Sequence, residues 1–453
     1  MVGGGASGAL VAVNLLRTAG PAGVEVLLMD RHGDFGPGIA YGTTNPDHRL
    51  NVAAARMGAL DGEPGHFLDW LQLSGNGAAL DQFAPRGVYG EYLRQLLQEA
   101  EAEAIDGTAR LRKLRVDVDS VAVSPKGVTV SGPGEDFECD HVVLAVGPLP
   151  SGDPFPIPEE LRDSGTYIPN AWDERDIDRA RGDDSVLIIG SGLTMVDAAI
   201  SLTSDRETNT MVRTISRNGM VPVAHRSDYV SIDPPVVPAG GEELSLAYAT
   251  GLFLDAKRRA ESAGGDWRDA MDSMRPVTPE LWRRMPLADR RWFLRNLQRV
   301  WETHRFRMAP EIAIRFEELV LSGRVAVSSG RISRIEPATD GARVSLATPD
   351  GQVVLDVDHI INSTGASGNI LSTASPLLRG LIDSGAIRPD ELLLGLDVAP
   401  SGRAIEMNGA ESDRISLIGS IRRGAEWESI GITEIRVQAA AIARDLMAPS
   451  RRQ

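Results

Sequence analysis

The residues with the clearest chemistry stand at the start of the chain, in the sequence GGGASG at positions 3–8. A glycine-rich turn of this spacing lets the backbone approach a pyrophosphate, and the helix that follows directs N–H groups at the phosphates. Asp30 closes the hydrophobic run 26–29, where a carboxylate can accept hydrogen bonds from the ribose hydroxyls of an adenosine. The predicted residues of this dinucleotide site are Gly3, Gly5, Ala6, Ser7, Gly8, Asp30 and Arg31.

The strand that leads into this turn is expected to be unusually short. Only Met1 and Val2 precede Gly3, whereas a strand commonly has about five or six residues. We therefore expect the sheet to have a weak edge at this place.

A second turn of the same kind lies in the middle of the chain. Residues 185–198 read SVLIIGSGLTMVDA, an apolar strand that runs into a glycine turn and then into a helix through about residue 202. Met195 stands where a third glycine is expected, so we expect the helix and the strand to lie farther apart there. The predicted phosphate contacts are Gly190, Gly192 and Thr194.

The strand after the second turn distinguishes the two sites. Residues 211–215 lead into Ser216 and Arg217, whereas the corresponding strand of the first site ends in an acid. A carboxylate repels a 2′-phosphate, and an arginine can form charge-assisted hydrogen bonds to it. We interpret the first site as binding FAD and the second as binding NADPH, through Ser216 and Arg217. The alternative is that Arg217 is a solvated surface residue.

Two further apolar strands end in small-residue turns. Residues 140–148 include Gly147, and residues 358–366 include Gly365. Each segment comes after a nucleotide fold in the sequence. Each is therefore compatible with a strand that leaves that fold next to the bound cofactor. Taken alone, either segment is also consistent with an ordinary strand that stops at a glycine.

Residues 244–321 change to a helical pattern, and the stretch 282–307 is dense in arginine. One interpretation is an amphipathic helix with a basic, solvated face. The other is a lid in which His304, Arg305 and Arg307 face a small anionic substrate. A local cationic cluster can attract such a substrate in a chain whose net charge is −16.

The end of the chain returns to an α/β pattern. A strand at 415–418 ends at Gly419, a loop continues through Trp427, and a helix is predicted from about residue 428 to 446. Gly419 and Trp427 are predicted to contact the cofactor. The positive end of that helix dipole would stabilise charge on the pyrimidine side of a reduced flavin, with Ser429 and Ile430 in the first turn. The alternative is a terminal helix that only packs.

Composition limits the class of partner. The chain has 453 residues, enough for two or three domains, and 47 basic against 63 acidic residues argue against nucleic acid or an anionic membrane as partner. No apolar run is long enough to span a bilayer. The single Cys139 excludes an internal disulfide and a redox cysteine pair, which indicates a cytoplasmic protein. The seven histidines lack metal-ligand spacing, so no metal site is predicted.

Over nearly its whole length the chain resembles a family of bacterial FAD/NAD(P)-binding proteins. The resemblance rests on GGGASGA at 3–9, FGPGIAYGT at 35–43, HRLNVAAARMGAL at 48–60, GSGLTMVD at 190–197, HRFRMAPE at 304–311 and RRGAEWESIGITEIRVQAA at 422–440. Members look like single-component flavin monooxygenases of a urate hydroxylase type and an aspartate N-oxygenase type, and the layout is more distantly similar to ornithine and lysine N-hydroxylases. The resemblance implies that NADPH reduces FAD and that reduced FAD captures O2 as a C4a-hydroperoxide. It also implies that Asn51 and Val52 lie near the isoalloxazine ring.

These patterns predict an α/β fold with two Rossmann-like dinucleotide-binding domains and a mainly helical insertion. The FAD-binding domain would span 1–155 and 368–453, and the NADPH-binding domain 156–367, with the insertion at about 244–321. The expected function is an FAD- and NADPH-dependent monooxygenase that uses O2 to N-oxygenate a small anionic amino acid such as aspartate. The alternatives are hydroxylation of a urate-like heterocycle, an NADPH-dependent flavin reductase or electron-transfer protein, and a flavin-binding sensor. No acid–base pair identifies itself as catalytic.

Overall fold

The computed structural model of the chain describes residues 1–20, 23–75, 79–104, 108–182, 185–205, 209–226, 228–365 and 368–448. Ala366, at the end of one predicted strand and turn, lies outside these described residues. The same is true of residues 449–453, which end the predicted first domain.

The first glycine turn is carried by a largely parallel sheet. Its strands are β2 (Ala109–Arg115), β1 (Val24–Asp30), β6 (Val142–Leu144), β16 (Glu411–Leu417) and β15 (Arg403–Ile405). β1 pairs with β2 and β6 pairs with β16, both in parallel, while β15 pairs antiparallel with β16. Val2 joins the two halves, because it bridges Leu144 on one side and Met29 on the other.

The first strand is as short as predicted, but it does not form a weak edge. The Val2 N–H donates to the Val143 carbonyl at 2.9 Å, and the Ala145 N–H donates to the Val2 carbonyl at 2.8 Å. On the other side the Met29 N–H donates to the Met1 carbonyl at 3.0 Å. Two residues therefore lie at the centre of the sheet, because strands far away in sequence cover both of their sides.

Three helices form a shared apolar core on this sheet, and the first of them packs against the other two. They are α1 (Ala6–Thr18), α4 (Arg86–Glu103) and α16 (Ile432–Met447). The close fit of α1 depends on Gly8, since a Cβ atom there would lie 2.0 Å from the Gly3 carbonyl oxygen. Gly3 itself has a φ of +107°, and a Cβ atom there would lie 2.1 Å from the Ala145 carbonyl oxygen.

The second glycine turn is carried by a five-stranded sheet whose neighbouring strands all pair in parallel. In spatial order the strands are β10 (Val325–Ser329), β9 (Met211–Ser216), β8 (Ser185–Ile189), β14 (His359–Asn362) and β7 (Tyr167–Ile168). Helices α7 (Leu193–Leu202) and α13 (Pro310–Leu321) share its core. Met195, a residue of α7, is fully buried in that core.

A three-stranded antiparallel sheet is attached to each nucleotide fold. One consists of β3 (Ser120–Ser124), β4 (Gly127–Gly132) and β5 (Glu135–Cys139), and the other of β11 (Arg331–Ala338), β12 (Gly341–Thr348) and β13 (Gly351–Val357). Each precedes the strand that carries a predicted small-residue turn, β6 or β14.

A group of helices follows β9 and its loop. Its helices are α8 (Leu246–Ser262), α9 (Trp267–Met274), α10 (Thr278–Arg284), α11 (Leu287–Asn296) and α12 (Gln298–Arg305). Although α13 also falls within the predicted range, its buried residues Ile312 and Phe316 belong to the core of the second nucleotide fold. We therefore refer to α8–α12 as the helical insertion.

Short helices complete the described chain. They are α2 (Gly38–Tyr41), α3 (His66–Leu73), α5 (Glu159–Asp163), α6 (Glu174–Arg179), α14 (Pro376–Asp383) and α15 (Arg423–Glu426), with 3-10 turns at Ala54–Arg56, Ile370–Ser372 and Gly419–Arg422. None of the described helices combines the length and apolarity that a membrane span requires.

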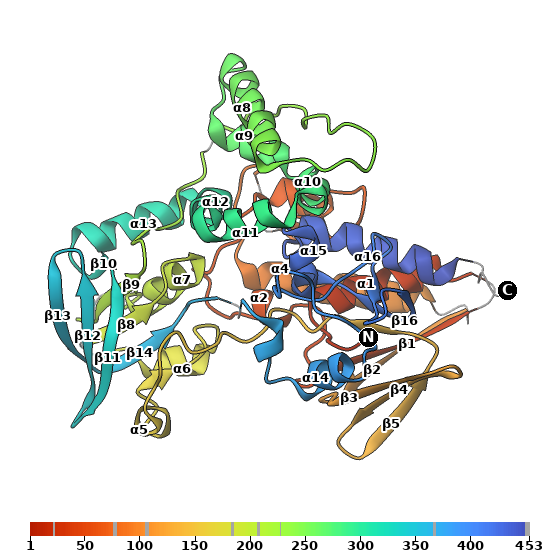
Figure 1. Cartoon of the computed structure of the whole chain (residues 1–453), viewed down its shortest axis with the longest axis horizontal. Helices are drawn as coiled ribbons and strands as arrows, with labels where there is room; N and C mark the ends of the chain where they lie inside the picture. The colour runs from red at the N-terminus through yellow and green to blue at the C-terminus, as the bar shows by residue number, and fades with distance from the viewer. Residues whose placement is uncertain are drawn as a thin grey trace.

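Figure 1 shows the two nucleotide folds side by side, with α1 and α16 in one and β8, β9 and α7 in the other, while α8 and α9 project above them. The predicted fold class, an α/β fold with two Rossmann-like sheets and helical regions, is confirmed.

Candidate active site

One large cleft joins the two glycine turns. Its volume is about 2400 Å³, whereas a pocket for a single drug-sized ligand usually has about 300–1,000 Å³. The predicted FAD-site residues that line it are Gly3, Gly5, Ala6, Ser7, Asp30, Arg31, Asn51, Val52, Gly147 and Ile430. The predicted NADPH-site residues that line it are Gly190, Gly192, Thr194, Ser216, Arg217 and Gly365. The cleft therefore has room for more than one ligand between the two turns.

The first turn offers uncommitted backbone donors to the cleft. Helix α1 begins after Gly5, and no side chain caps its N-terminus. The backbone is crowded at this point, since a Cβ atom on Gly5 would lie 3.1 Å from the Cα atom of Gly38. An uncapped helix N-terminus on a cleft presents N–H groups and a positive dipole end, which suit a pyrophosphate.

Asp30 lies at the end of β1 beside this turn. One carboxylate oxygen accepts from the backbone N–H groups of His32 (2.8 Å) and Gly33 (3.0 Å), and the other accepts from the Gly4 N–H (3.2 Å). A carboxylate has about four acceptor positions. Asp30 therefore ties the glycine turn to the end of β1 and keeps acceptor capacity for a ribose hydroxyl.

The second turn repeats the arrangement. Helix α7 begins after Gly192, again without a side-chain cap. Gly190 has a φ of +120°, and a Cβ atom there would lie 2.6 Å from the Ser363 carbonyl oxygen at the end of β14. Ser191 donates its hydroxyl to Ser216 at 2.8 Å, which connects the turn to the end of β9.

Two arginines stand beside the second turn. Arg217 is exposed, lines the cleft, and forms no hydrogen bond or ion pair with any described residue. Arg299 of α12 donates from Nη2 to the carbonyl oxygen (2.8 Å) and hydroxyl (2.9 Å) of Ser191. Burial, and then the like charge of Arg217, lowers the pKa of Arg299, whereas Glu302 raises it. Sequence reasoning missed Arg299, since the arginine-dense pattern of 282–307 does not indicate which arginine meets the turn.

The helical insertion and the C-terminal segment are joined by ion pairs along the cleft. These pairs are Arg275–Glu434, Arg305–Glu428 and Arg423–Glu302, and all six residues line the cleft. Burial opposes the charge on Arg305, but Glu428 outweighs it and holds the pKa of Arg305 above its ordinary value. We call this row of three pairs the ion-pair wall.

Two of the three predicted substrate residues lie away from the cleft. Arg307 is only 1% exposed and pairs with Asp272. His304 turns its ring to the Val300 carbonyl (2.8 Å) and packs edge-on against Trp267. Neither lines the cleft, and Arg305 is the one member of the predicted set that does. The reason is local: each of the other two side chains meets a partner within the insertion or its flanks.

The C-terminal predictions also need correction. Helix α16 begins at Ile432, because Gly431 before it is extended (φ −84°, ψ 155°), so Ser429 and Ile430 precede the first turn. Ser429 is fully buried, while Ile430 lines the cleft. Trp427 stacks on Trp282 with ring centroids 4.9 Å apart and does not line the cleft.

Gly8 and Gly419 have packing roles and do not line the cleft. Gly8 lies against the Gly3 carbonyl, as described above. The Gly419 N–H donates to Gln438 at 2.9 Å, and a Cβ atom at Gly419 would lie 3.0 Å from the Ser7 hydroxyl oxygen. No cluster of potential metal ligands occurs among the residues that the structure describes.

Comparisons with known proteins show what the chain is similar to. Residues 1–149 match a family model described as FAD-NAD(P)-binding. This part of the chain therefore belongs to an FAD/NAD(P)-binding domain. The chain is also 28% identical over 158 residues to the 3-dehydro-bile acid delta(4,6)-reductase of Clostridium scindens. That alignment covers 32% of this chain and 38% of the reductase, so it spans well under half of that protein.

Solved structures extend the likeness to the whole fold. The L-lysine 6-monooxygenase from Pseudomonas syringae has a TM-score of 0.64 at 17% identity, covering 99% of this chain and 98% of that one. The ornithine N-hydroxylase of Kutzneria sp. 744, solved with reduced FAD, NADP+ and L-ornithine, has a TM-score of 0.60 at 16% identity, covering 98% and 97%. The chain therefore has the fold of flavin-dependent oxidoreductases.

Proposed function

We propose that the chain is an NADPH-dependent FAD monooxygenase that N-oxygenates a small amino acid with an anionic side chain, aspartate being the first candidate. One observation supports the proposal most directly. The two glycine turns, whose helices have no side-chain cap, and the ion-pair wall all line the same cleft. NADPH, O2 and a proton would be consumed, one oxygen atom added to the substrate nitrogen, and the other released as water.

The glycine turns fit the two cofactors. The N-terminus of α1 and Asp30 would hold the pyrophosphate and ribose of FAD, and the N-terminus of α7 with Arg217 would hold those of NADPH. When bound, FAD supplies the transfer of electrons from NADPH and the activation of O2. The chain itself binds and orients the three reactants.

The ion-pair wall supports an amino acid as substrate. An amino acid with an acidic side chain carries two carboxylates and one ammonium group, and the wall brings both guanidinium groups and carboxylates to the cleft. Arg305 uses Nε and Nη2 on Glu428. Its Nη1 group has no partner among the described residues and would remain for a substrate carboxylate.

A flavin reductase is the second candidate, favoured by the partial likeness to a reductase over the nucleotide-binding part of the chain. A reductase that works through a dithiol is excluded, because Cys139 is the single cysteine of the sequence. A reductase would not need the ion-pair wall that lines the same cleft as the nucleotide turns, which favours the monooxygenase.

The test is NADPH oxidation by the FAD-loaded protein under air, with the product mass measured alongside. Aspartate should accelerate oxidation and gain one oxygen atom. Turnover of urate instead would support the heterocycle alternative and contradict the amino acid substrate. A rate that depends on an added electron acceptor, with no oxygenated product, would establish a reductase.

A further inference from the structure

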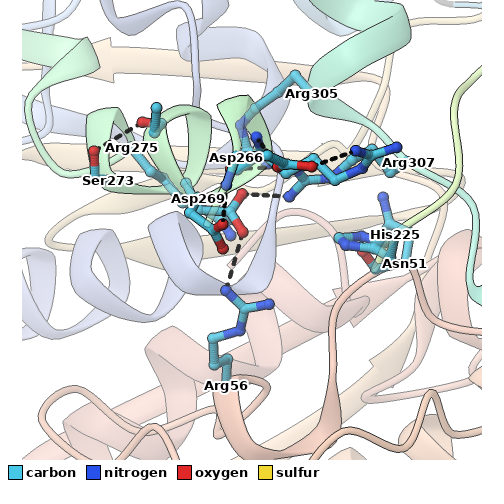
Figure 2. A network of polar contacts seen from close by, with 12 residues as sticks. Asn51, Arg56, His225, Asp266, Asp269, Ser273, Arg275, Arg305 and Arg307 are labelled. Carbon is cyan, nitrogen blue, oxygen red and sulfur yellow. Dashed lines mark hydrogen bonds and ion pairs between the residues drawn. The ribbon is translucent and has the colours of Figure 1, made fainter. Parts of the chain in front are cut away.

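The segment 51–56, which contains the residues proposed to face the flavin, is held from outside its own domain. Figure 2 shows Asn51, Arg56 and His225 within a network of polar contacts. At one end the Asn51 carbonyl oxygen lies 2.9 Å from Nε2 of His225, in the loop that follows β9. At the other end Arg56 donates to Asp272 of α9 at 3.2 Å. The loop after β9 therefore contacts one end of this segment, and the helical insertion contacts the other end.

The His225 contact has a defined direction. A carbonyl oxygen only accepts, so Nε2 must carry the hydrogen and donate to Asn51. Burial, and then the nearby Arg307 cation, lowers the pKa of His225 to about 3, so the ring is neutral at ordinary pH. The ring also packs against Phe83 with centroids 5.1 Å apart, which limits its rotation.

The Arg307 cation is itself fixed by buried charge. Asp272 accepts hydrogen bonds from both Arg307 and Arg56, and Arg307 also donates to the Arg268 carbonyl at 3.2 Å. Figure 2 shows Arg307 close to His225 and Asn51. This network explains why the His225 ring keeps one N–H and one orientation.

The fixed carbonyl also fixes the next peptide N–H. The peptide bond is planar and trans, so the Asn51 carbonyl and the Val52 N–H point in opposite directions. With the carbonyl turned to His225, the Val52 N–H points away from it. This N–H forms no hydrogen bond within the described chain, and both Asn51 and Val52 line the cleft.

We propose that His225 is a positioning residue that orients the 51–52 peptide so that the Val52 N–H donates to the edge of the flavin ring. The inference rests on the proposed function, since it requires FAD in the first site. It assigns a role to a side chain from outside the FAD-binding domain, through a backbone contact that no sequence motif marks.

Two substitutions separate the hydrogen bond from ring packing. His225→Phe keeps a ring against Phe83 and removes the donor, whereas His225→Gln keeps an N–H donor and removes the ring. We expect the Phe variant to shift the visible absorption and circular dichroism of bound FAD and to slow anaerobic reduction by NADPH about tenfold, the equivalent of one lost hydrogen bond. The Gln variant should resemble the parent. His66→Phe, a histidine off the cleft, is the matched control.

A second measurement uses the parent protein and does not depend on how the His225 variants fold. In protein labelled with 15N-valine, the Val52 amide resonance, assigned by its loss in Val52→Ile, should move downfield when FAD is added to apoprotein. An unmoved resonance overturns the inference, as does a His225→Phe variant with the parental flavin spectrum. Equal changes in the Phe and Gln variants would show that ring packing, and not the hydrogen bond, causes the effect. This result would also overturn the inference. A parent that binds no FAD refutes the proposed function instead, so the two failures are distinguishable.

Discussion

Arg305 and Glu428 form a buried ion pair with two hydrogen bonds, Nε to Oε1 at 2.8 Å and Nη2 to Oε2 at 2.9 Å. Their side chains are 7% and 4% exposed. The pair connects the last residue of α12 to the segment that leads into α16. It thus joins the helical insertion to the C-terminal helix beside the cleft.

Removing one member of this pair should destabilise the fold. Arg305→Ala leaves the buried Glu428 carboxylate without its partner, which typically costs about 3–5 kcal/mol. Denaturation in urea, followed by circular dichroism, measures the loss. Arg334→Ala, which breaks an exposed pair with Glu336, should cost at most about 1 kcal/mol. Equal losses in the two variants would contradict the structural role of the Arg305–Glu428 pair.

Arg217 should determine the preference for NADPH over NADH. Arg217→Ala removes an exposed guanidinium from the second site, so KM for NADPH should rise about tenfold or more, since each 1.4 kcal/mol is a factor of ten. The kinetics with NADH should stay nearly unchanged. Arg343→Ala serves as the control, because Arg343 lies in β12 and pairs with Asp356. A similar loss with both coenzymes would refute the contact with the 2′-phosphate.

Asp30 should distinguish FAD from FMN. Asp30→Asn keeps the shape of the side chain and weakens its charge-assisted hydrogen bonds, which contribute about 1.5–3 kcal/mol. The Kd for FAD, measured by fluorescence titration, should therefore rise about tenfold to a hundredfold. FMN lacks the adenosine ribose, so its weaker binding should change little. If both flavins lose affinity equally, the ribose contact is not the cause.

Gly8 should tolerate no side chain. Gly8→Ala would place a Cβ atom 2.0 Å from the Gly3 carbonyl oxygen, so α1 must move away from the turn. We expect a lower Tm and loss of bound FAD, measured by thermal unfolding and by flavin absorbance. Gly20→Ala is the matched control, because no atom lies within 4 Å of its added Cβ. Unchanged flavin content in Gly8→Ala would contradict the close approach.

Stability should fall on acidification through His141. Burial lowers the pKa of His141 to about 4, below the unfolded value of about 6.5. Between these values the unfolded chain binds more protons, so stability is full above pH ~6.5 and falls as the pH drops to ~4, by an amount on the order of 3 kcal/mol. His141→Gln should show a shallower loss in urea titrations across this range. An identical slope in parent and variant would exclude the contribution of His141.

The sequence alone determined the two glycine turns and the strands and helices around them. The second turn runs from β8 (Ser185–Ile189) into α7 (Leu193–Leu202), as its residues predict. Such turns are local: the spacing of glycines and apolar residues within a short segment sets the strand, the turn and the helix.

Tertiary structure decided which of the predicted residues share a surface. Arg305 and Arg307 are two positions apart, yet one lines the cleft and the other is buried against Asp272. Val2 lies at the centre of a sheet only because β1 and β6 close on it from distant parts of the chain. The contact between His225 and the Asn51 carbonyl cannot be predicted from the sequence either, because every residue has a backbone carbonyl oxygen. Pairings of this kind depend on how separate elements pack, and a pattern within one segment cannot specify its distant partner.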